Sequence, residues 1–376
     1  MHASALLPAS SRLFRTALIT VPLKPPSLLP RLQSLVPDVR YFPFQGPDGD
    51  PSSRRPTATD YADADAILAW AVPDDLRSAD QTPRLKIWQG YTASYAETVE
   101  TEFFQSVGDE RALTFANASG IAAPNIAEHV LGSVLTLTHK IHLAARASSW
   151  LPYSSAGGFF IRELSQLRVG IIGYGHIGRE TARLFTLCGA RVCALTRSGV
   201  RAPEVGYRLS GRGDPTGALP EQWYSTRVRA SVLEFLGTCD VVVNCLPDSP
   251  PTRGFIGRDE FAAMKGDAIY VNVGRGNTTD QEALVEALRA QPGEGEEAGA
   301  TGTLRIGAAA LDVVTPEPLP SSSPLWALPN AIITMHWSGA ASSYHSRALD
   351  LLMENIRRID AGEGALNVYR GEGVKP

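Results

Sequence analysis

The chain has 376 residues, of which 44% are hydrophobic and 20% are charged, as expected for a globular protein of two or three domains. Its net charge is −4 and its isoelectric point about 6.0, and no basic stripe in the sequence indicates a nucleic-acid partner. No apolar run reaches the roughly 18 residues that suggest a membrane span. The four cysteines are predicted to be buried thiols, because they lie in apolar segments without metal-ligand spacing. We therefore expect no nucleic acid, membrane or metal ion as partner.

The first 37 residues bear on localisation. They contain four basic residues, several serines and no acidic residue, which resembles a transit peptide. However, residues 16–21 are predicted to form a first strand, and Pro22, Pro25 and Pro26 do not suit a targeting helix. We predict a cytoplasmic protein, with organelle import as the alternative.

Strand-like segments alternate with helical ones in the first third of the chain. The predicted strands are residues 17–21, 39–44, 66–71 and 85–90. Residues 46–59, rich in Pro, Gly, Ser and Arg, are predicted to form a mobile surface loop. Residues 125–147 are predicted to form one long helix, with Pro124 suited to its first turn. The alternation indicates a small doubly wound α/β unit.

A second α/β unit is predicted to begin near Val169. Its predicted strands are residues 167–172, 191–195, 240–246, 268–273, 307–313 and 331–334. Helices are predicted at residues 178–187, 255–264, 281–289 and 343–359. Two Gly-rich loops, residues 200–220 and 291–303, are predicted to be solvated insertions.

Residues 170–178 read Gly-Ile-Ile-Gly-Tyr-Gly-His-Ile-Gly, between a predicted strand and a predicted helix. This context identifies the Gly-x-Gly-x-x-Gly motif as a dinucleotide-binding fingerprint. An ordinary glycine-rich turn would lack the preceding strand and the following helix. Gly173 permits the tight turn, Gly175 lets the pyrophosphate approach, and Gly178 lets the helix lie close to the sheet. The N–H groups of the first helical turn then face the phosphates. The predicted cofactor contacts are Gly173, Tyr174, Gly175, His176, Ile177 and Gly178.

The end of the next strand bears on the choice of dinucleotide. A Rossmann site usually carries an acidic residue there, which bonds the ribose 2′-hydroxyl. Here the strand ends in Thr196, Arg197 and Ser198, without a carboxylate. Arg197 could pair with a 2′-phosphate, and the two hydroxyls could donate hydrogen bonds to it. We predict NADP(H), with NAD(H) as the alternative if Arg197 is only a solvated loop residue.

Several segments resemble, in chain order, the D-isomer-specific 2-hydroxyacid dehydrogenase family. They are residues 117–121 and 126–129, the fingerprint, 244–247 with Thr252, 271–276, 310–313, 317–318 and 334–336. The resemblance extends from about residue 85 to residue 367. It implies an α/β protein with two doubly wound parallel-sheet domains and a cleft between them. A Rossmann-type cofactor domain (117–338) would be inserted in a smaller, flavodoxin-like substrate domain (1–116 and 339–376).

Reduction of a 2-keto acid leaves negative charge on the former carbonyl oxygen, so a proton donor and a cation are needed. Histidine gives a proton near neutral pH, and His336 is the candidate acid/base. Glu317 matches the family residue that favours the imidazolium and orients it. Arg275 would clamp the substrate carboxylate. Taken singly, the three could be a structural histidine, a turn residue and a surface arginine.

Other positions are assigned from the resemblance. Asp312 matches the residue that bonds the nicotinamide carboxamide, and His129 is expected to be structural. Further predicted cofactor contacts are Leu246, Pro247, Thr252 and Val273. The predicted substrate loop contains Thr92, Ala93 and Ser94. Ser94 and Met335 depart from the family pattern of Gly and Pro, and Trp337 is expected either near the pocket or in the core.

The predicted function is reduction of a small 2-keto acid, such as glyoxylate or hydroxypyruvate, to the D-2-hydroxy acid. The protein is expected to be a homodimer, since residues 125–147 resemble the arm through which the family dimerises. Two alternatives remain at this stage. One is an NAD-dependent family member that acts on a larger 2-hydroxy acid, and the other is a dinucleotide-sensing, corepressor-like binding protein.

Overall fold

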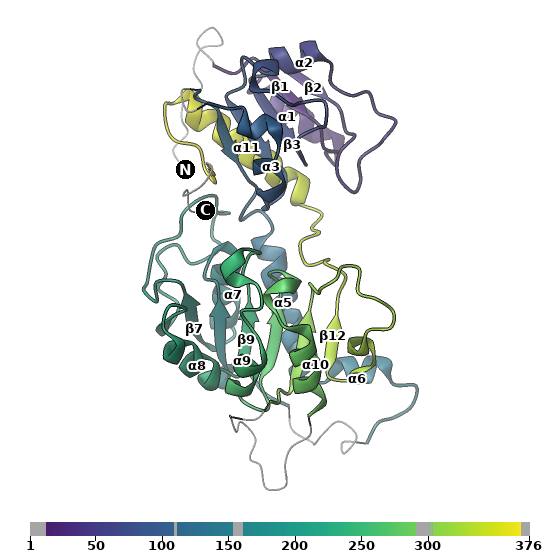
Figure 1. Ribbon diagram of the computed structural model, residues 1–376, viewed down its shortest axis with the longest axis vertical. Coiled ribbons are helices and arrows are strands. Elements are labelled where there is room, and N and C mark those ends of the chain that lie inside the picture. Colours follow the sequence, from purple (N-terminus) through teal and green to yellow (C-terminus); the bar gives the residue numbers. More distant parts are fainter. Residues whose placement is uncertain (1–12, 109–110, 153–160, 291–301, 303, 370–376) are drawn as a thin grey trace. The chain divides into compact units, whose positions relative to one another are not determined.

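A computed structural model of the chain describes residues 13–108, 111–152, 161–290, 302 and 304–369 (Figure 1). The chain divides into two compact units. The first comprises Met1–Ile121, Val205–Tyr207 and Ser342–Pro376, and the second comprises Ala122–Glu204 and Arg208–Ala341. Each unit contains one parallel sheet, which confirms the predicted class of two parallel-sheet α/β domains.

The first unit contains a five-stranded parallel sheet in the order β2-β1-β3-β4-β5. The strands are β1 (Thr16–Ile19), β2 (Asp38–Tyr41), β3 (Ala66–Ala69), β4 (Ile87–Gly90) and β5 (Thr114–Ala116). The α-helices are α1 (Leu29–Gln33), α2 (Ala58–Asp63), α3 (Ala96–Val99), α4 (Glu102–Gln105) and α11 (Tyr344–Asp360). Four of the strands were predicted, whereas the three-residue β5 was not. The predicted surface loop 46–59 ends earlier than expected, because α2 begins within it.

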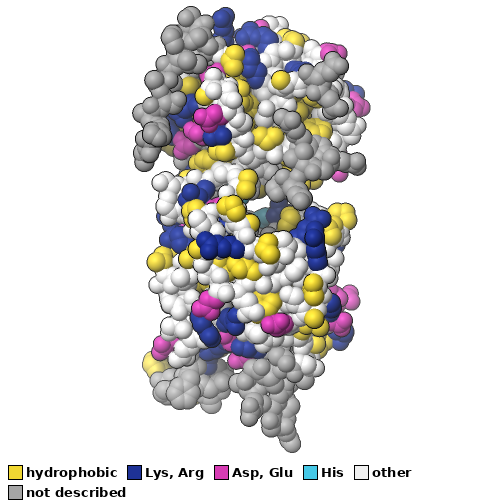
Figure 2. All heavy atoms as spheres, turned by 90° about the vertical axis from the view of Figure 1, so that its left-hand side faces the viewer, with side chains coloured by type: hydrophobic (Ala, Val, Ile, Leu, Met, Phe, Trp, Pro, Cys, Tyr) yellow, Lys and Arg dark blue, Asp and Glu magenta, His cyan; other side chains and the backbone are white. Residues whose placement is uncertain are grey.

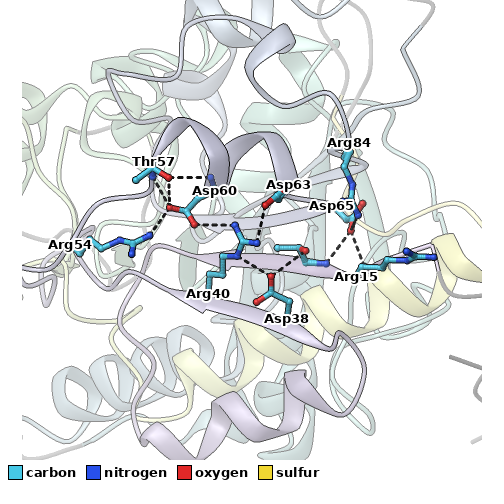
Figure 3. A network of polar contacts seen from close by, with 10 residues as sticks. Arg15, Asp38, Arg40, Arg54, Thr57, Asp60, Asp63, Asp65 and Arg84 are labelled. Atoms are coloured by element: carbon cyan, nitrogen blue, oxygen red, sulfur yellow. Dashed lines mark hydrogen bonds and ion pairs between the residues drawn. The ribbon is translucent and has the colours of Figure 1, made fainter. Parts of the chain in front are cut away.

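A buried carboxylate joins the starts of the strands in this first sheet. Asp65, which is 1% exposed, accepts hydrogen bonds from the backbone N–H groups of Arg15 and Thr16 at 2.8 and 3.0 Å. The same carboxylate is paired with Arg84 at 3.0 Å and with Lys86 at 2.6 Å. Figure 3 shows Asp65 between Arg15 and Arg84. Burial by itself would raise the pKa of Asp65, but the bonds from Lys86 and from the two N–H groups lower it.

A second polar cluster lies beside it and is centred on Arg40 of β2 (Figure 3). The Arg40 guanidinium bonds Asp38, Asp60 and Asp63 at 2.9, 3.0 and 2.9 Å. Asp60 also closes the first turn of α2, because its carboxylate accepts the Thr57 N–H at 2.8 Å. These bonds lower the pKa of Asp60 to about 2, although burial alone would raise it. The cluster ties a helix to the edge strand of the sheet.

The second unit contains a seven-stranded parallel sheet in the order β12-β11-β10-β9-β6-β7-β8. The strands are β6 (Arg168–Ile172), β7 (Arg191–Thr196), β8 (Gln222–Ser225), β9 (Val241–Asn244), β10 (Ile269–Asn272), β11 (Ala308–Leu311) and β12 (Ala331–Ile333). The chain runs outward from β6 through β7 to β8 and then returns to β9 on the other side of β6. The strand order therefore reverses between β6 and β9, which is where doubly wound sheets bind their ligands.

Helices cover both faces of this second sheet. The α-helices of this unit are α5 (Ala123–Thr138), α6 (Ile141–Arg146), α7 (His176–Leu187), α8 (Arg229–Thr238), α9 (Arg258–Ala263) and α10 (Gln281–Arg289). Along β9, Val241 and Val243 pack in an apolar cluster with α5 and α7, whereas Val242 packs in a cluster with α8, α9 and α10. Because successive side chains of a strand point to opposite faces, burial of all three requires helices on both sides.

Three expectations are wrong in detail. The helix predicted at residues 125–147 is two helices, because Lys140 adopts a left-handed conformation (φ 57°) that ends α5 before α6 begins. Strand β8 follows the loop 200–220 and was not predicted. Cys188 is exposed at the end of α7, whereas Cys193 and Cys239 are buried as expected. The predicted loop 291–303 falls almost wholly outside the described residues.

The surface mixes side chains of different kinds. On the face drawn in Figure 2, Lys and Arg side chains are interspersed with acidic and hydrophobic ones. Among the described residues, no helix is both long and apolar enough to cross a membrane.

Replacement of the buried carboxylate tests how the first unit is stabilised. Asp65→Asn should lower the free energy of unfolding by about 2–3 kcal/mol at pH 7, because it leaves backbone donors and two cations poorly paired. The pKa of Asp65 is lowered on folding, so its contribution is present above about pH 4 and is lost as the pH falls further. Urea unfolding at pH 7 and at pH 3 measures both effects.

The variant should therefore differ from the parent much more at pH 7 than at pH 3. Asp48→Asn is the control, because Asp48 pairs with Lys24 through side chains that are 58% and 62% exposed. Exposed pairs contribute little to stability. Equal unfolding midpoints for parent and Asp65→Asn at pH 7 would contradict the assignment.

Candidate active site

Three neighbouring strands of the second sheet end beside one another, and the candidate residues follow them. Arg275 comes after β10, Asp312 directly after β11, and His336 after β12. The register pairs Asn272 with Leu311 and Leu311 with Ile333, so the strand ends are level. Adjacent strands lie about 4.8 Å apart, and the three positions therefore share one edge of the sheet. The carboxyl edge is where parallel α/β sheets hold ligands.

The imidazole of His336 is bonded to the carboxylate of Glu317. The His336 Nδ1 atom lies 3.0 Å from Glu317 Oε2, and the other carboxylate oxygen accepts the Val314 N–H at 3.1 Å. Since a carboxylate only accepts hydrogen bonds, Nδ1 carries a proton, and Nε2 is not used in the bond to Glu317. The two side chains are 48% and 39% exposed, so an incoming molecule can reach the imidazole.

The backbone at His336 is in the left-handed region, with φ 58°. This conformation is uncommon for residues other than glycine. The His336 N–H donates to the backbone oxygen of Asp312 at 2.9 Å, and the Trp337 N–H donates to Asp312 Oδ1 at 3.0 Å. Trp337 itself is 64% exposed and Met335 is 54% exposed, so Trp337 does not belong to the core.

Arg275 is fixed through its backbone at the end of β10. Its carbonyl oxygen accepts hydrogen bonds from Asn272 Nδ2 at 3.1 Å and from Thr278 Oγ1 at 2.6 Å. One guanidinium nitrogen donates to the Gly274 oxygen at 2.8 Å. Within the described part of the chain, no hydrogen bond or ion pair joins Arg275 to His336 or Glu317. The structure thus brings the histidine and the glutamate into contact and places the arginine at the same sheet edge.

The fingerprint forms the turn from β6 into α7. Gly173 has φ +87°, a conformation that side chains rarely allow, and Gly175 precedes the helix with open space around its α-carbon on the side-chain face. At Gly178 a β-carbon would lie 2.5 Å from the Gly173 oxygen and 2.9 Å from Ile171 Cγ2. Gly178 therefore allows the close approach of helix and strand. Ile177 packs against the apolar cluster beneath α7.

The loop 200–220 is hydrogen-bonded to α7, although most of its residues are exposed or half-exposed, as expected of a solvated loop. Tyr174 OH donates to Asp214 Oδ2 at 2.8 Å. Arg179, which is 5% exposed, donates to the backbone oxygens of Asp214 and Ala202 at 2.6 and 2.9 Å. Burial and the nearby Asp214 carboxylate raise the pKa of Tyr174, so its hydroxyl remains a donor. The Tyr174 side chain thus supports this loop.

Glu204 lies beside the fingerprint turn, which the sequence did not indicate. Its carboxylate lies 2.8 Å from His176 Nδ1, at the first residue of α7. Glu204 is also paired with Arg208 at 3.3 Å, and its side chain is 6% exposed. A carboxylate therefore stands beside the turn predicted to meet a pyrophosphate. No short-range pattern signals it, because Glu204 follows β7 in a segment without regular structure.

The end of β7 keeps the three residues predicted to meet a 2′-phosphate next to one another. Thr196 Oγ1 accepts the Gly199 N–H at 3.1 Å, and the Arg197 backbone oxygen accepts a hydrogen bond from Ser225 Oγ at 3.0 Å. The side chains of Arg197 and Ser198 are exposed. The backbone of this turn is therefore fixed, while the Arg197 side chain is exposed to solvent.

The remaining predicted cofactor contacts follow β9 and β10. Asn244 Oδ1 accepts the Leu246 N–H at 3.0 Å, and the Val273 N–H donates to the Asn244 backbone oxygen at 3.1 Å. Thr252 Oγ1 donates to the Pro247 oxygen at 2.6 Å and so closes its own turn. The Thr252 hydroxyl therefore already has a partner in the protein.

The predicted substrate loop belongs to the first unit. Thr92 Oγ1 donates to the Ser94 backbone oxygen at 3.2 Å, and the Ala118 N–H donates to the Thr92 oxygen at 2.8 Å. Ala93 and Ser94 are exposed. Their role in substrate binding stays a prediction.

Comparisons with known proteins agree with this geometry. A model of the NAD-binding domain of D-isomer-specific 2-hydroxyacid dehydrogenases matches residues 131–338. The chain is 31% identical to glyoxylate reductase/hydroxypyruvate reductase from Mus musculus over 65% of its length and 66% of that protein. It is 26% identical to glyoxylate reductase from Thermofilum pendens over 83% of each chain.

One solved structure is similar to this chain over nearly its whole length. A D-isomer-specific 2-hydroxyacid dehydrogenase from Xanthobacter autotrophicus Py2, crystallised in complex with NADPH and MES, matches with a TM-score of 0.67 and 25% identity. The match covers 95% of this chain and 98% of the other. The family model and this solved structure therefore indicate the same family.

Two glycine substitutions should separate packing from ligand access. Gly178→Ala forces its β-carbon against backbone, and overpacking of this kind costs about 1–3 kcal/mol, which corresponds to a fall in melting temperature of about 2–12 °C. Gly175→Ala meets nothing within 4 Å and should melt like the parent. It should nevertheless weaken NADPH binding, because its methyl group stands where the pyrophosphate approaches.

Differential scanning fluorimetry and titration of NADPH fluorescence measure the two effects. A Gly178→Ala protein that melts at the parent temperature would contradict the close helix–strand contact. Unchanged NADPH affinity in Gly175→Ala would contradict the placement of the pyrophosphate.

Proposed function

Because this chain belongs to the D-isomer-specific 2-hydroxyacid dehydrogenase family, we propose that it reduces a small 2-keto acid to the D-2-hydroxy acid with NADPH. The chain is an oxidoreductase, and the names of its relatives support glyoxylate or hydroxypyruvate as the substrate type. The observation that carries the proposal is the His336–Glu317 bond at the carboxyl edge of the sheet that holds the fingerprint. Homodimer formation and a cytoplasmic location stay predictions from the sequence.

The residues present fit a bound dinucleotide. Gly175 leaves its side-chain face open, the first turn of α7 presents backbone N–H groups, and the Arg197 side chain is exposed beyond β7. When bound, the reduced nicotinamide supplies the hydride for the keto carbon.

His336 supplies the proton in this mechanism. Its Nδ1–H is held by Glu317, so the proton is delivered from Nε2 to the oxygen that becomes the hydroxyl. The Glu317 carboxylate stabilises the positive charge of the imidazolium before transfer and keeps the ring in one orientation. The remaining Glu317 oxygen is fixed by the Val314 N–H, so the pair cannot rotate freely.

Arg275 holds the substrate in the same mechanism. Its guanidinium offers a planar fork of donors that matches a carboxylate. The fork also stabilises the negative charge that develops on the neighbouring oxygen during reduction. Hydrogen bonds from Asn272 and Thr278 fix the backbone of Arg275, so only its side-chain torsions remain to orient the guanidinium.

The residues at the end of β7 support a preference for NADPH. The segment Thr196–Ser198 has no carboxylate to repel a 2′-phosphate, and Arg197 offers a cation to it. Glu204 does not change this argument, because its carboxylate is already bonded to His176 and paired with Arg208. The NADPH complex of the Xanthobacter autotrophicus relative gives further support.

The proposed reaction is tested with a panel of 2-keto acids that includes glyoxylate, hydroxypyruvate and larger analogues. NADPH oxidation should be detectable with the smallest members. His336→Gln should lower kcat by about 10²–10⁴-fold, because it removes the proton donor, and it should leave NADPH affinity nearly unchanged. His139→Gln is the control, since His139 is exposed at the end of α5. The absence of turnover with both NADPH and NADH across the panel would refute the proposal.

Cofactor preference is tested at Arg197. Arg197→Ala should raise the KM for NADPH about tenfold or more, because a charge-assisted bond to the 2′-phosphate is lost, and should leave the KM for NADH unchanged. Arg258→Ala, which removes an exposed arginine paired with Glu286, serves as the control. Equal changes with both dinucleotides, or a parent enzyme that prefers NADH, would contradict an Arg197–phosphate contact.

A further inference from the structure

A buried polar network joins the ends of β9 and β10 to the segment that carries Arg275. Its five side chains are at most 9% exposed. They come from the end of β9, from β10 and from the turn that follows it, and they are Asn244, Tyr270, Asn272, Thr278 and Thr279. A buried polar group is costly unless it is hydrogen-bonded, so the partners of these side chains show what the network holds.

Two side chains of this network donate to the Arg275 carbonyl oxygen. They are Asn272, through Nδ2 at 3.1 Å, and Thr278, through Oγ1 at 2.6 Å. Asn244 Nδ2 in turn donates to Thr278 Oγ1 at 2.9 Å, and Asn272 Nδ2 also donates to Thr279 Oγ1 at 3.1 Å. Each side chain that holds the arginine backbone is therefore itself held by a further hydrogen bond.

The Tyr270 hydroxyl connects the two branches of the network. It accepts a hydrogen bond from Asn244 Nδ2 at 2.9 Å and lies 2.6 Å from Thr279 Oγ1. Burial raises the pKa of Tyr270 to about 12, so the hydroxyl keeps its proton and can donate it to Thr279. The ring packs edge-on against Phe261, with centroids 5.4 Å apart. Because apolar packing holds the ring, the hydroxyl can be removed without loss of the ring's contacts.

The backbone on either side of Arg275 is closely packed. A β-carbon at Gly274 would collide with the Leu246 backbone, and one at Gly276 would collide with the Val314 backbone. The arginine segment thus packs against the segments that follow β9 and β11. Together with the network, these contacts fix the point from which the guanidinium extends.

We propose that Tyr270 is a positioning residue for Arg275, and that its hydroxyl acts through the buried network rather than on the substrate. This inference rests on the proposed function, in which Arg275 binds the substrate carboxylate. A forked contact between a guanidinium and a carboxylate depends on the placement of both groups. A misplacement of about 1 Å caused by a residue far from the chemistry can cost about 10²-fold in rate.

Removing single hydroxyls tests the inference. Tyr270→Phe keeps the ring and loses the bonds of the hydroxyl. Thr278→Val keeps the shape of the side chain and loses its bond to the Arg275 carbonyl oxygen, whereas Thr278→Ser keeps the hydroxyl. Tyr224→Phe is the matched control, because Tyr224 is a 3% exposed tyrosine of the edge strand β8 that packs on Phe235, with centroids 5.5 Å apart.

We expect Tyr270→Phe and Thr278→Val to raise the KM for the 2-keto acid roughly tenfold, because the guanidinium loses its fixed placement. The KM should change more than kcat, since the arginine binds the carboxylate before the reaction as well as during it. NADPH affinity should stay within about twofold of the parent, because the bond from the Leu246 N–H to Asn244 is retained. Thr278→Ser and Tyr224→Phe should retain the parent KM.

Binding without turnover gives a second measure of the same contact. Oxamate, an unreactive isostere of a 2-keto acid, is titrated into the NADPH complex and followed by NADPH fluorescence. It should bind roughly tenfold more weakly to Tyr270→Phe and to Thr278→Val than to the parent. Parent-like KM and oxamate affinity in both variants would overturn the proposal. So would a loss of NADPH affinity as large as the rise in KM, which would indicate a general structural defect.

Amide hydrogen exchange in the unliganded protein separates this inference from the reaction itself. The Thr278 N–H donates to the Arg275 oxygen at 3.2 Å, and the Gly274 N–H donates to Asn272 Oδ1 at 3.0 Å. In Tyr270→Phe these amides should exchange faster than in the parent, while peptides from α7 keep the parent rate.

Two exchange results would contradict the inference. Unchanged exchange at residues 274–278 would show that the hydroxyl does not hold the arginine segment, and faster exchange throughout the second unit would show a merely structural role. If the parent turns over none of the 2-keto acids, the proposed function fails, and the exchange rates still decide whether Tyr270 holds the Arg275 backbone.

Discussion

Parallel strand pairing is the constraint on which the rest of the second unit depends. In a parallel sheet every strand runs the same way, so residues that follow different strands meet at one edge. The fingerprint after β6, Arg275 after β10, Asp312 after β11 and His336 after β12 share that edge although they are far apart in the chain. The reversal of strand order between β6 and β9 leaves this edge free for a ligand.

Buried carboxylates organise the loops at both sheets. A buried charge is costly unless donors surround it, so each such residue fixes the groups that compensate it. Asp65 holds the start of the first sheet, Asp214 holds the loop beside α7, and Asp312 holds the turn that carries His336. Hydrogen bonds from N–H groups and Tyr174 lower the pKa of Asp214, although burial alone would raise it. These segments are thereby fixed without regular secondary structure.

At the candidate site the backbone is fixed by hydrogen bonds, whereas the His336 side chain is accessible. The backbone around His336 is held by several hydrogen bonds, while its side chain is about half exposed. At Arg275 the carbonyl oxygen is likewise bonded, and one guanidinium nitrogen donates to the Gly274 oxygen. Preorganised groups of this kind stabilise charge that develops during a reaction without reorganising at that moment. The roles proposed for His336 and Arg275 suit the reduction of an anionic keto acid.

Local sequence was sufficient for the fingerprint, for most strands and for helix α10, whose bounds match the predicted residues 281–289. Glycine spacing and apolar periodicity act over a few residues, so they can be interpreted without the rest of the chain. The family motifs also pointed to Arg275, Glu317 and His336, of which the structure bonds Glu317 to His336. Short edge strands such as β5 and β8 were missed because their strand character depends on a neighbour.

Only the tertiary structure decided which partners the buried polar groups have. The bond between Glu204 and His176, the anchoring of loop 200–220 and the enclosure of Asp312 all join segments distant in sequence. Such contacts leave no periodic trace, because a buried charge is stabilised by whichever donors the fold brings to it. The sequence by itself thus determined the chemistry available at the sheet edge, and the packing of loops against that edge determined which groups hold it in place.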